Sequence, residues 1–134
     1  MRVGNHFYIG RSERTNAEGA RQLAGILSDG GYTSSEIPVR GVLHLKTGVT
    51  HIGRNAFVAI DEFAGKFPSG PVIRIEEEEG YAANCLRANG TLLMPAGFPR
   101  VRQQIAGLGY PILEVEMSEF RKMDGGLTCL SLVW

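Results

Sequence analysis

The order of its apolar segments constrains the fold of this 134-residue chain more than any other feature. Three stretches share one pattern, in which an apolar strand is followed by an amphipathic helix and then by a second apolar strand. They cover residues 7–39, 57–75 and 92–115. Alternating strands and helices are typical of the α/β class, and the irregular spacing indicates an imperfect repeat of about 40 residues. Because no linker or low-complexity tract separates the stretches, we expect residues 1–134 to form a single domain.

Turn and capping residues place the individual elements along the chain. Thr15 and Glu18 form a capping-box pattern, which predicts a helix that ends at Gly30-Gly31. Asn89-Gly90 predicts a hairpin between strands at 83–88 and 91–94. The other expected elements are a hairpin turn at Gly4-Asn5, strands at 35–39, 42–45, 56–60, 72–75, 112–115 and 127–133, helices at 61–66 and 99–107, and a helical turn at 118–122.

Composition excludes several classes of protein. Fourteen basic residues balance fourteen acidic ones, whereas a nucleic-acid-binding domain carries a basic surface. The chain has no apolar run of about 18 residues, and its first residues lack the apolar core of a signal peptide. Two cysteines are too few for a disulfide scaffold. We therefore expect a cytoplasmic protein that binds neither nucleic acid nor a membrane.

Cys129 and Cys85 are the two candidate nucleophiles. Cys129 follows Gly125-Gly126 inside an apolar segment, and glycines allow a backbone to approach a ligand closely. Cys85 is an equally good candidate from the residues alone, and both can also be ordinary buried core cysteines. His44 is the candidate base because a thiol needs a base or a cationic neighbour to become a thiolate, and Lys46 would share its strand face.

Other charged residues and histidines are weaker candidates. The acidic run from Glu76 to Glu79 is typical of a solvated face. Zinc or a disulfide would involve both cysteines, but the spacing of Cys and His residues does not favour a metal site, and we expect no cofactor. Candidates for binding a substrate carboxylate are Arg11, Arg14, Arg100 and Arg102, and the weaker histidine candidates are His6 and His51.

Several motifs together resemble the dimethylarginine dimethylaminohydrolases. The motifs are Asn5-His6-Phe7-Tyr8-Ile9-Gly10, Arg14-Thr15-Asn16-Ala17-Glu18-Gly19-Ala20-Arg21, His44-Leu45-Lys46-Thr47-Gly48, Tyr81-Ala82-Ala83-Asn84-Cys85, Met94-Pro95-Ala96-Gly97 and Asp124-Gly125-Gly126-Leu127-Thr128-Cys129-Leu130-Ser131. The resemblance covers nearly the whole chain. It implies part of a pentein fold, an α/β propeller with five strand–helix repeats.

The resemblance also implies roles for individual residues. Cys129 matches the nucleophile that attacks the guanidinium carbon of a methylated arginine, and His44 matches the general acid and base. Arg14 matches the arginine that holds the α-carboxylate of this small guanidino substrate, and Cys85 matches a structural position. Related deiminases and amidinotransferases usually have an acidic residue where this chain has Lys46, which favours the dimethylaminohydrolases.

Length is where the chain departs from the family. Family members are about twice as long, so the chain resembles the C-terminal half, and the carboxylates that bind the guanidinium group are expected on the other half. The alternative is therefore a non-catalytic half that serves as a binding or assembly module. Half of a propeller has open strand edges, and apolar strands such as residues 57–60 would be uncovered. We therefore expect a homo-oligomer, most simply a dimer.

Overall fold

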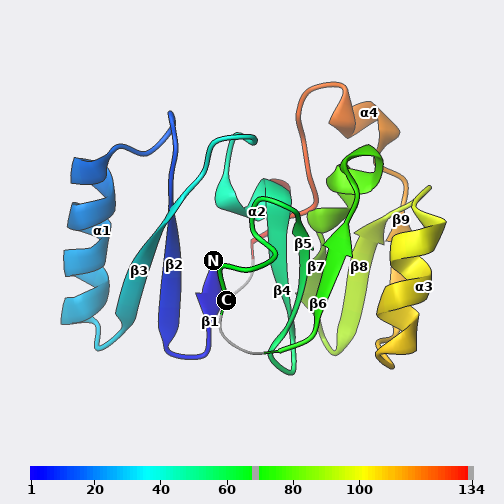
Figure 1. The fold of residues 1–134 in the computed structure, drawn as a ribbon, viewed down its shortest axis with the longest axis horizontal. Coiled ribbons are helices and arrows are strands. Elements are labelled where there is room, and N and C mark those ends of the chain that lie inside the picture. The colour runs from blue at the N-terminus through cyan, green and yellow to red at the C-terminus, as the bar shows by residue number, and fades with distance from the viewer. Residues whose placement is uncertain (68–69, 133–134) are drawn as a thin grey trace. The chain divides into compact units, whose positions relative to one another are not determined.

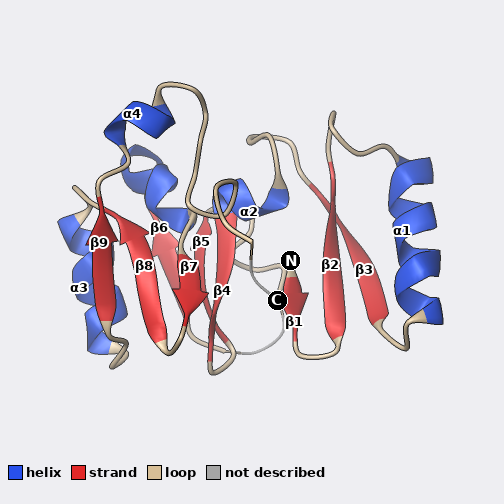
Figure 2. Ribbon diagram, turned by 180° about the vertical axis from the view of Figure 1, so that it is seen from behind, coloured by secondary structure: helices blue, strands red, loops and turns tan. Residues whose placement is uncertain are grey.

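The computed structural model describes residues 1–67 and 70–132, and the chain divides into two compact units, Met1–Leu45 and Lys46–Trp134. Each unit is described by itself, and the single domain expected from the sequence stays a prediction. Three small sheets recur along the chain, and each has three strands (Figures 1 and 2). In each sheet the first two strands are antiparallel and the third is parallel to the second. The strands of the three predicted repeats are therefore confirmed, and the predicted helix is present in the first and third repeats but not in the second.

The first unit contains one repeat. Its elements are β1 (Arg2–Val3), β2 (His6–Arg11), α1 (Ala17–Asp29) and β3 (Thr33–Pro38). The predicted turn at Gly4-Asn5 joins β1 to β2, and Gly4 has a positive φ of 58° that suits glycine. The helix α1 contacts both β2 and β3. It begins at the Asn16 cap, whose side chain accepts a hydrogen bond from the backbone N–H of Gly19.

The second unit contains the other two repeats. Its elements, in chain order, are α2 (Leu45–Gly48), whose first residue lies in the first unit, β4 (Val49–Gly53), β5 (Ala56–Ile60), β6 (Val72–Ile75), η1 (Glu77–Ala83), β7 (Leu86–Ala88), β8 (Thr91–Pro95), α3 (Pro99–Gly107), β9 (Ile112–Val115) and α4 (Ser118–Arg121). The Asn89-Gly90 turn between β7 and β8 is confirmed, with positive φ at both residues. The helix α3 begins at Pro99, where a proline is tolerated.

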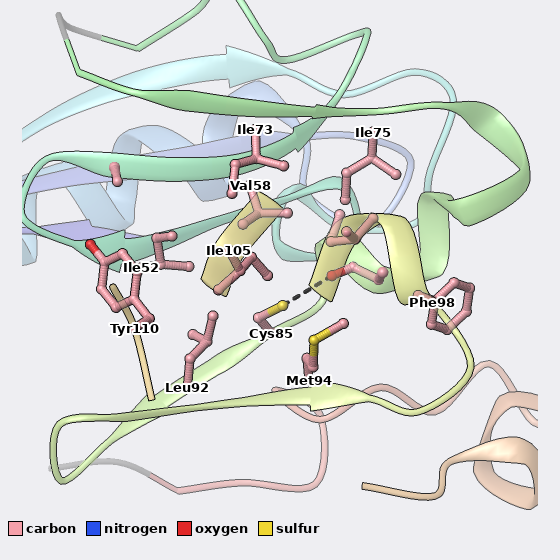
Figure 3. Packing of buried hydrophobic residues seen from close by; sticks show 14 residues of the cluster. Ile52, Val58, Ile73, Ile75, Cys85, Leu92, Met94, Phe98, Ile105 and Tyr110 are labelled. Atoms are coloured by element: carbon pink, nitrogen blue, oxygen red, sulfur yellow. Dashed lines mark hydrogen bonds between the residues drawn. The ribbon is translucent and has the colours of Figure 1, made fainter. Parts of the chain in front are cut away.

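The main core of the second unit lies between its two repeats (Figure 3). Ile52, Val58 and Ile73 come from β4, β5 and β6, and they pack with Leu92 from β8 and Ile105 from α3. The 57–60 strand is buried inside this unit, with Phe57 only 1% exposed. The expectation that this strand is an uncovered apolar surface was therefore wrong.

Three elements expected from the sequence are absent from the described residues. The 61–66 segment forms successive turns rather than a helix, since each bond spans three residues, as in Phe63 N–H to the Ile60 carbonyl. Burial of the Phe63 ring holds this segment in its turns. Residues 42–44 form bends that lead into α2 instead of a strand. Residues 127–130 form a turn, and Val133 lies outside the described residues.

Within the described residues, no helix combines the length and the apolar character that a membrane crossing requires.

Candidate active site

Cys129 lies in an exposed turn that follows α4. Its backbone N–H donates a 3.0 Å hydrogen bond to the carbonyl oxygen of Gly126, and the N–H of Leu130 donates to the same oxygen over 3.3 Å. The Ser131 hydroxyl closes the turn by donating to the Leu127 carbonyl over 2.6 Å. A thiol in an exposed turn is accessible to a ligand, whereas a thiol inside a buried strand is not.

Two side chains anchor the backbone just before Cys129. The Tyr81 hydroxyl donates to the Gly125 carbonyl over 2.6 Å, and the Asn84 Oδ1 accepts from the N–H of Thr128 over 3.0 Å. Tyr81 lies in η1 and Asn84 directly follows it, so both come from the segment after the carboxyl end of β6. The carboxyl ends of parallel strands are the usual place for a binding site in an α/β protein.

Lys46 is the cationic neighbour of Cys129. Its side chain is half-buried in α2, and burial lowers the pKa of its ammonium group. The negative charge of the Cys129 thiolate acts in the opposite direction and raises that pKa. Lys46 belongs to a short helix, and the strand face that it was expected to share with His44 does not form.

Cys85 has the opposite surroundings. It is fully buried in the core of the second unit, and its thiol donates to the Ala82 carbonyl over 3.0 Å (Figure 3). Burial raises the pKa of this thiol to about 12. A thiol that remains protonated and inaccessible does not act as a nucleophile. Of the two candidate nucleophiles, only Cys129 is accessible.

Arg14 and His44 both lie in the first unit, near the carboxyl ends of its two parallel strands. Arg14 follows β2 in a tight turn in which its backbone N–H donates to the Ser12 hydroxyl over 3.1 Å. His44 follows β3, and both side chains are exposed. The segment with His44 returns to β2, because a Cβ added at Gly10 would lie 2.8 Å from the Cβ of the buried Leu45.

Most of the other candidate arginines and histidines interact with side chains of this chain. Arg11, Arg100 and Arg102 each pair with a glutamate at the surface. In the described part of the chain, the Arg14 guanidinium forms no ion pair, so it is available to a carboxylate. Both ring nitrogens of His6 are within hydrogen-bond distance of hydroxyls, those of Thr33 and Ser35.

The remaining expectations concern the acidic run and a metal. Glu76, Glu77 and Glu78 are exposed, as expected for a solvated face. Among the described residues, no group of three or more His, Cys, Asp or Glu side chains is gathered in a way that could hold a metal ion. Tyr81 and Asn84 were in a motif that carried the family resemblance, but nothing in the sequence indicates their contacts with the turn of Cys129.

Comparison with known proteins gives close matches along nearly the whole chain. The curated dimethylarginine dimethylaminohydrolase of Pseudomonas aeruginosa is 52% identical over 98% of this chain and 53% of its own length. Its counterpart from Streptomyces coelicolor is 33% identical over 98% of this chain and 51% of its own length. The chain therefore spans about half the length of the curated relatives it matches. No protein-family model matches the sequence.

A solved structure gives the same result for the fold. The structure of a cysteine-to-serine variant of the Pseudomonas aeruginosa enzyme, in complex with citrulline, matches all of this chain and 53% of its own, with a TM-score of 0.96 and 51% identity. The chain therefore forms part of a pentein fold. Over the length that it spans, the chain belongs to the dimethylarginine dimethylaminohydrolase family.

Proposed function

We propose that the protein is an amidine hydrolase that converts a methylated arginine and water into citrulline and a methylamine. The observation that carries this proposal is the 52% identity, over 98% of the chain, to the dimethylarginine dimethylaminohydrolase of Pseudomonas aeruginosa. The free and exposed Cys129 also supports it, because the reaction needs an accessible sulfur nucleophile.

The proposed reaction has two stages. The Cys129 thiolate attacks the guanidinium carbon, and His44 donates a proton to the nitrogen of the methylamine as its bond to that carbon breaks. The product of this stage is a covalent thiouronium intermediate. His44 then accepts a proton from water, which attacks the same carbon. The bond to sulfur breaks, the thiolate is restored and citrulline leaves, so one water is consumed for each amine released.

Arg14 is the proposed ligand of the substrate's α-carboxylate. A guanidinium group can form two parallel hydrogen bonds to a carboxylate, which fixes the orientation of the bound amino acid. Its exposed position after the carboxyl end of β2 is consistent with this role. The proposed reaction uses no cofactor.

A second candidate function is a non-catalytic binding or assembly module. The observation that favours it is that the chain spans 53% of the Pseudomonas aeruginosa relative. A cationic guanidinium group needs carboxylates in its pocket, and we expect those on the part of the relatives that this chain does not match. On this interpretation, Cys129 would be present without turnover.

Citrulline formation by the purified chain decides between the two candidates. Dimethylarginine is supplied in excess, and citrulline is measured against time. We expect the rate of citrulline formation to fall on the order of 10⁴-fold in Cys129→Ser. The rate should persist in Cys85→Ala. Arg14→Ala is expected to raise KM more than it lowers kcat, because it removes a contact to a part of the substrate that does not react. A folded chain that forms no citrulline at high concentration contradicts the hydrolase and favours the module.

We also propose that the protein is a homo-oligomer, most simply a dimer, and that it works in the cytoplasm. Exposed apolar side chains in the second unit support the first proposal, with Met123 85% exposed and Leu132 87% exposed. The two free cysteines support the second, because thiols usually stay reduced in the cytoplasm.

A further inference from the structure

Two side chains bind the loop before Cys129, and the reaction described above gives neither of them a role. Tyr81 donates to the Gly125 carbonyl, and Asn84 accepts from the N–H of Thr128. The two bonds reach the backbone on either side of Gly126, and the second lies one residue before the thiol. They therefore restrain both ends of the short segment that leads into the turn of Cys129.

The packing between Asn84 and this loop is tight. The Asn84 side chain is buried, and a Cβ added to Gly126 would lie 2.6 Å from its Nδ2 atom. Real Cβ atoms essentially never approach another heavy atom so closely. The backbone of the loop thus rests directly on the amide of Asn84, and only glycine leaves room for this contact.

Tyr81 is held in place by its own neighbours. The Arg121 guanidinium lies over the Tyr81 ring, 4.9 Å from its centroid, and the Phe98 ring centroid is 6.1 Å away. Burial raises the pKa of the Tyr81 hydroxyl, so the group keeps its proton at neutral pH and remains a donor. The donor to Gly125 is therefore fixed before any ligand binds.

The turn itself transmits this restraint to the thiol. The N–H groups of Cys129 and Leu130 both bond to the Gly126 carbonyl, so the residues that carry the thiol are tied to the residue packed on Asn84. A shift of the 125–128 segment would move Cys129 with it. Misplacement of a reacting group by about 1 Å can cost about 100-fold in rate.

We propose that Tyr81 and Asn84 are positioning residues, which anchor the 125–128 loop and hold the Cys129 thiol in its position within the turn. The proposal deepens the proposed function and rests on it only for the role of Cys129 as the nucleophile. Neither residue is assigned contact with the substrate, so each acts through the loop.

Alkylation of the native protein by iodoacetamide tests the proposal. The reaction reports Cys129 alone, because Cys85 is buried, and Cys129→Ser serves as the blank. We expect Tyr81→Phe and Asn84→Ala each to change the second-order rate constant at pH 7 by at least about threefold, since the thiol then leaves the position in which the anchored turn holds it. Tyr81→Phe keeps the aromatic ring, and it decides the test if Asn84→Ala does not fold.

Tyr110→Phe is the matched control. Tyr110 also donates its hydroxyl to a backbone carbonyl, that of Gly53, over 2.8 Å, and this bond is buried in the same unit. Loss of this hydrogen bond should lower the free energy of unfolding by about 1 kcal/mol, as in Tyr81→Phe, and should leave the alkylation rate unchanged. Equal rates in Tyr81→Phe and Tyr110→Phe would overturn the proposal.

Alkylation does not require turnover, so a chain that forms no citrulline contradicts the proposed hydrolase while this test still gives its answer.

Discussion

Gly126 lies so close to Asn84 that no side chain fits between them. We expect Gly126→Ala to lower the free energy of unfolding by about 1–3 kcal/mol, because the loop must move away from the buried amide. The same movement should change the rate of Cys129 alkylation. Urea unfolding and iodoacetamide kinetics measure the two effects on one sample.

Gly107→Ala is the control for this substitution. Gly107 ends α3 in the same unit, and a Cβ added there would meet nothing within 4 Å. Alanine in a helix is favoured over glycine by about 0.5–1 kcal/mol, so this variant should be as stable as the native protein or more stable, with unchanged alkylation. If both glycine variants behave alike, the conclusion that the contact between Gly126 and Asn84 leaves no room for a side chain is contradicted.

At the scale of the element, the residue that caps α1 in the structure differs from the one that the sequence pattern predicts. The pattern predicts that Thr15 caps the helix, whereas in the structure the Asn16 side chain accepts from the N–H of Gly19 over 2.8 Å. Asn16→Ala should therefore lower the free energy of unfolding by about 1 kcal/mol, and Thr15→Ala should lower it less. Urea unfolding curves of the two variants decide which residue is the cap, and the reverse order would favour Thr15.

His51, in β4, should make the stability of the protein depend on pH, independently of the candidate active site. Burial lowers the pKa of its ring and the nearby Arg87 lowers it further, and its Nε2 atom is buried without a hydrogen-bond partner. Since the unfolded chain binds this proton more readily, stability is complete above the ordinary pKa of about 6.5 and falls as the pH drops below it. His51→Phe should lose less stability between pH 7.5 and pH 5 than the native protein does. Parallel losses measured by urea unfolding would contradict this.

The repeated elements could be predicted from the sequence because their signals are local. Asn89-Gly90 defines its own hairpin, and Pro99 marks the first residue of α3. The 61–66 segment was predicted wrongly because burial of Phe63, a tertiary effect, keeps it in turns. For the site, the sequence pointed to Cys129, but Tyr81 and Asn84 bind residues 44 positions away along the chain. No local pattern encodes such a contact.

At the scale of the whole molecule, self-association would be driven by apolar side chains other than those expected from the sequence. The 57–60 strand is buried within its own unit and cannot contribute to an interface. The proposed contact for a second copy of the chain is instead formed by exposed apolar side chains of the C-terminal segment. These side chains are Phe120, Met123, Leu130 and Leu132.

Charge substitutions in this segment test the proposed oligomer. We expect the native chain to sediment as a dimer whose fraction rises with protein concentration, and Met123→Lys with Leu132→Lys to shift it toward the monomer, because each lysine would be desolvated in the contact. Ile26→Lys, at an exposed position of α1 in the other unit, is the control and should leave the distribution unchanged. A native chain that stays monomeric across the concentration range contradicts the oligomer. Equal effects of Ile26→Lys and of the paired substitution would contradict the C-terminal segment as its interface.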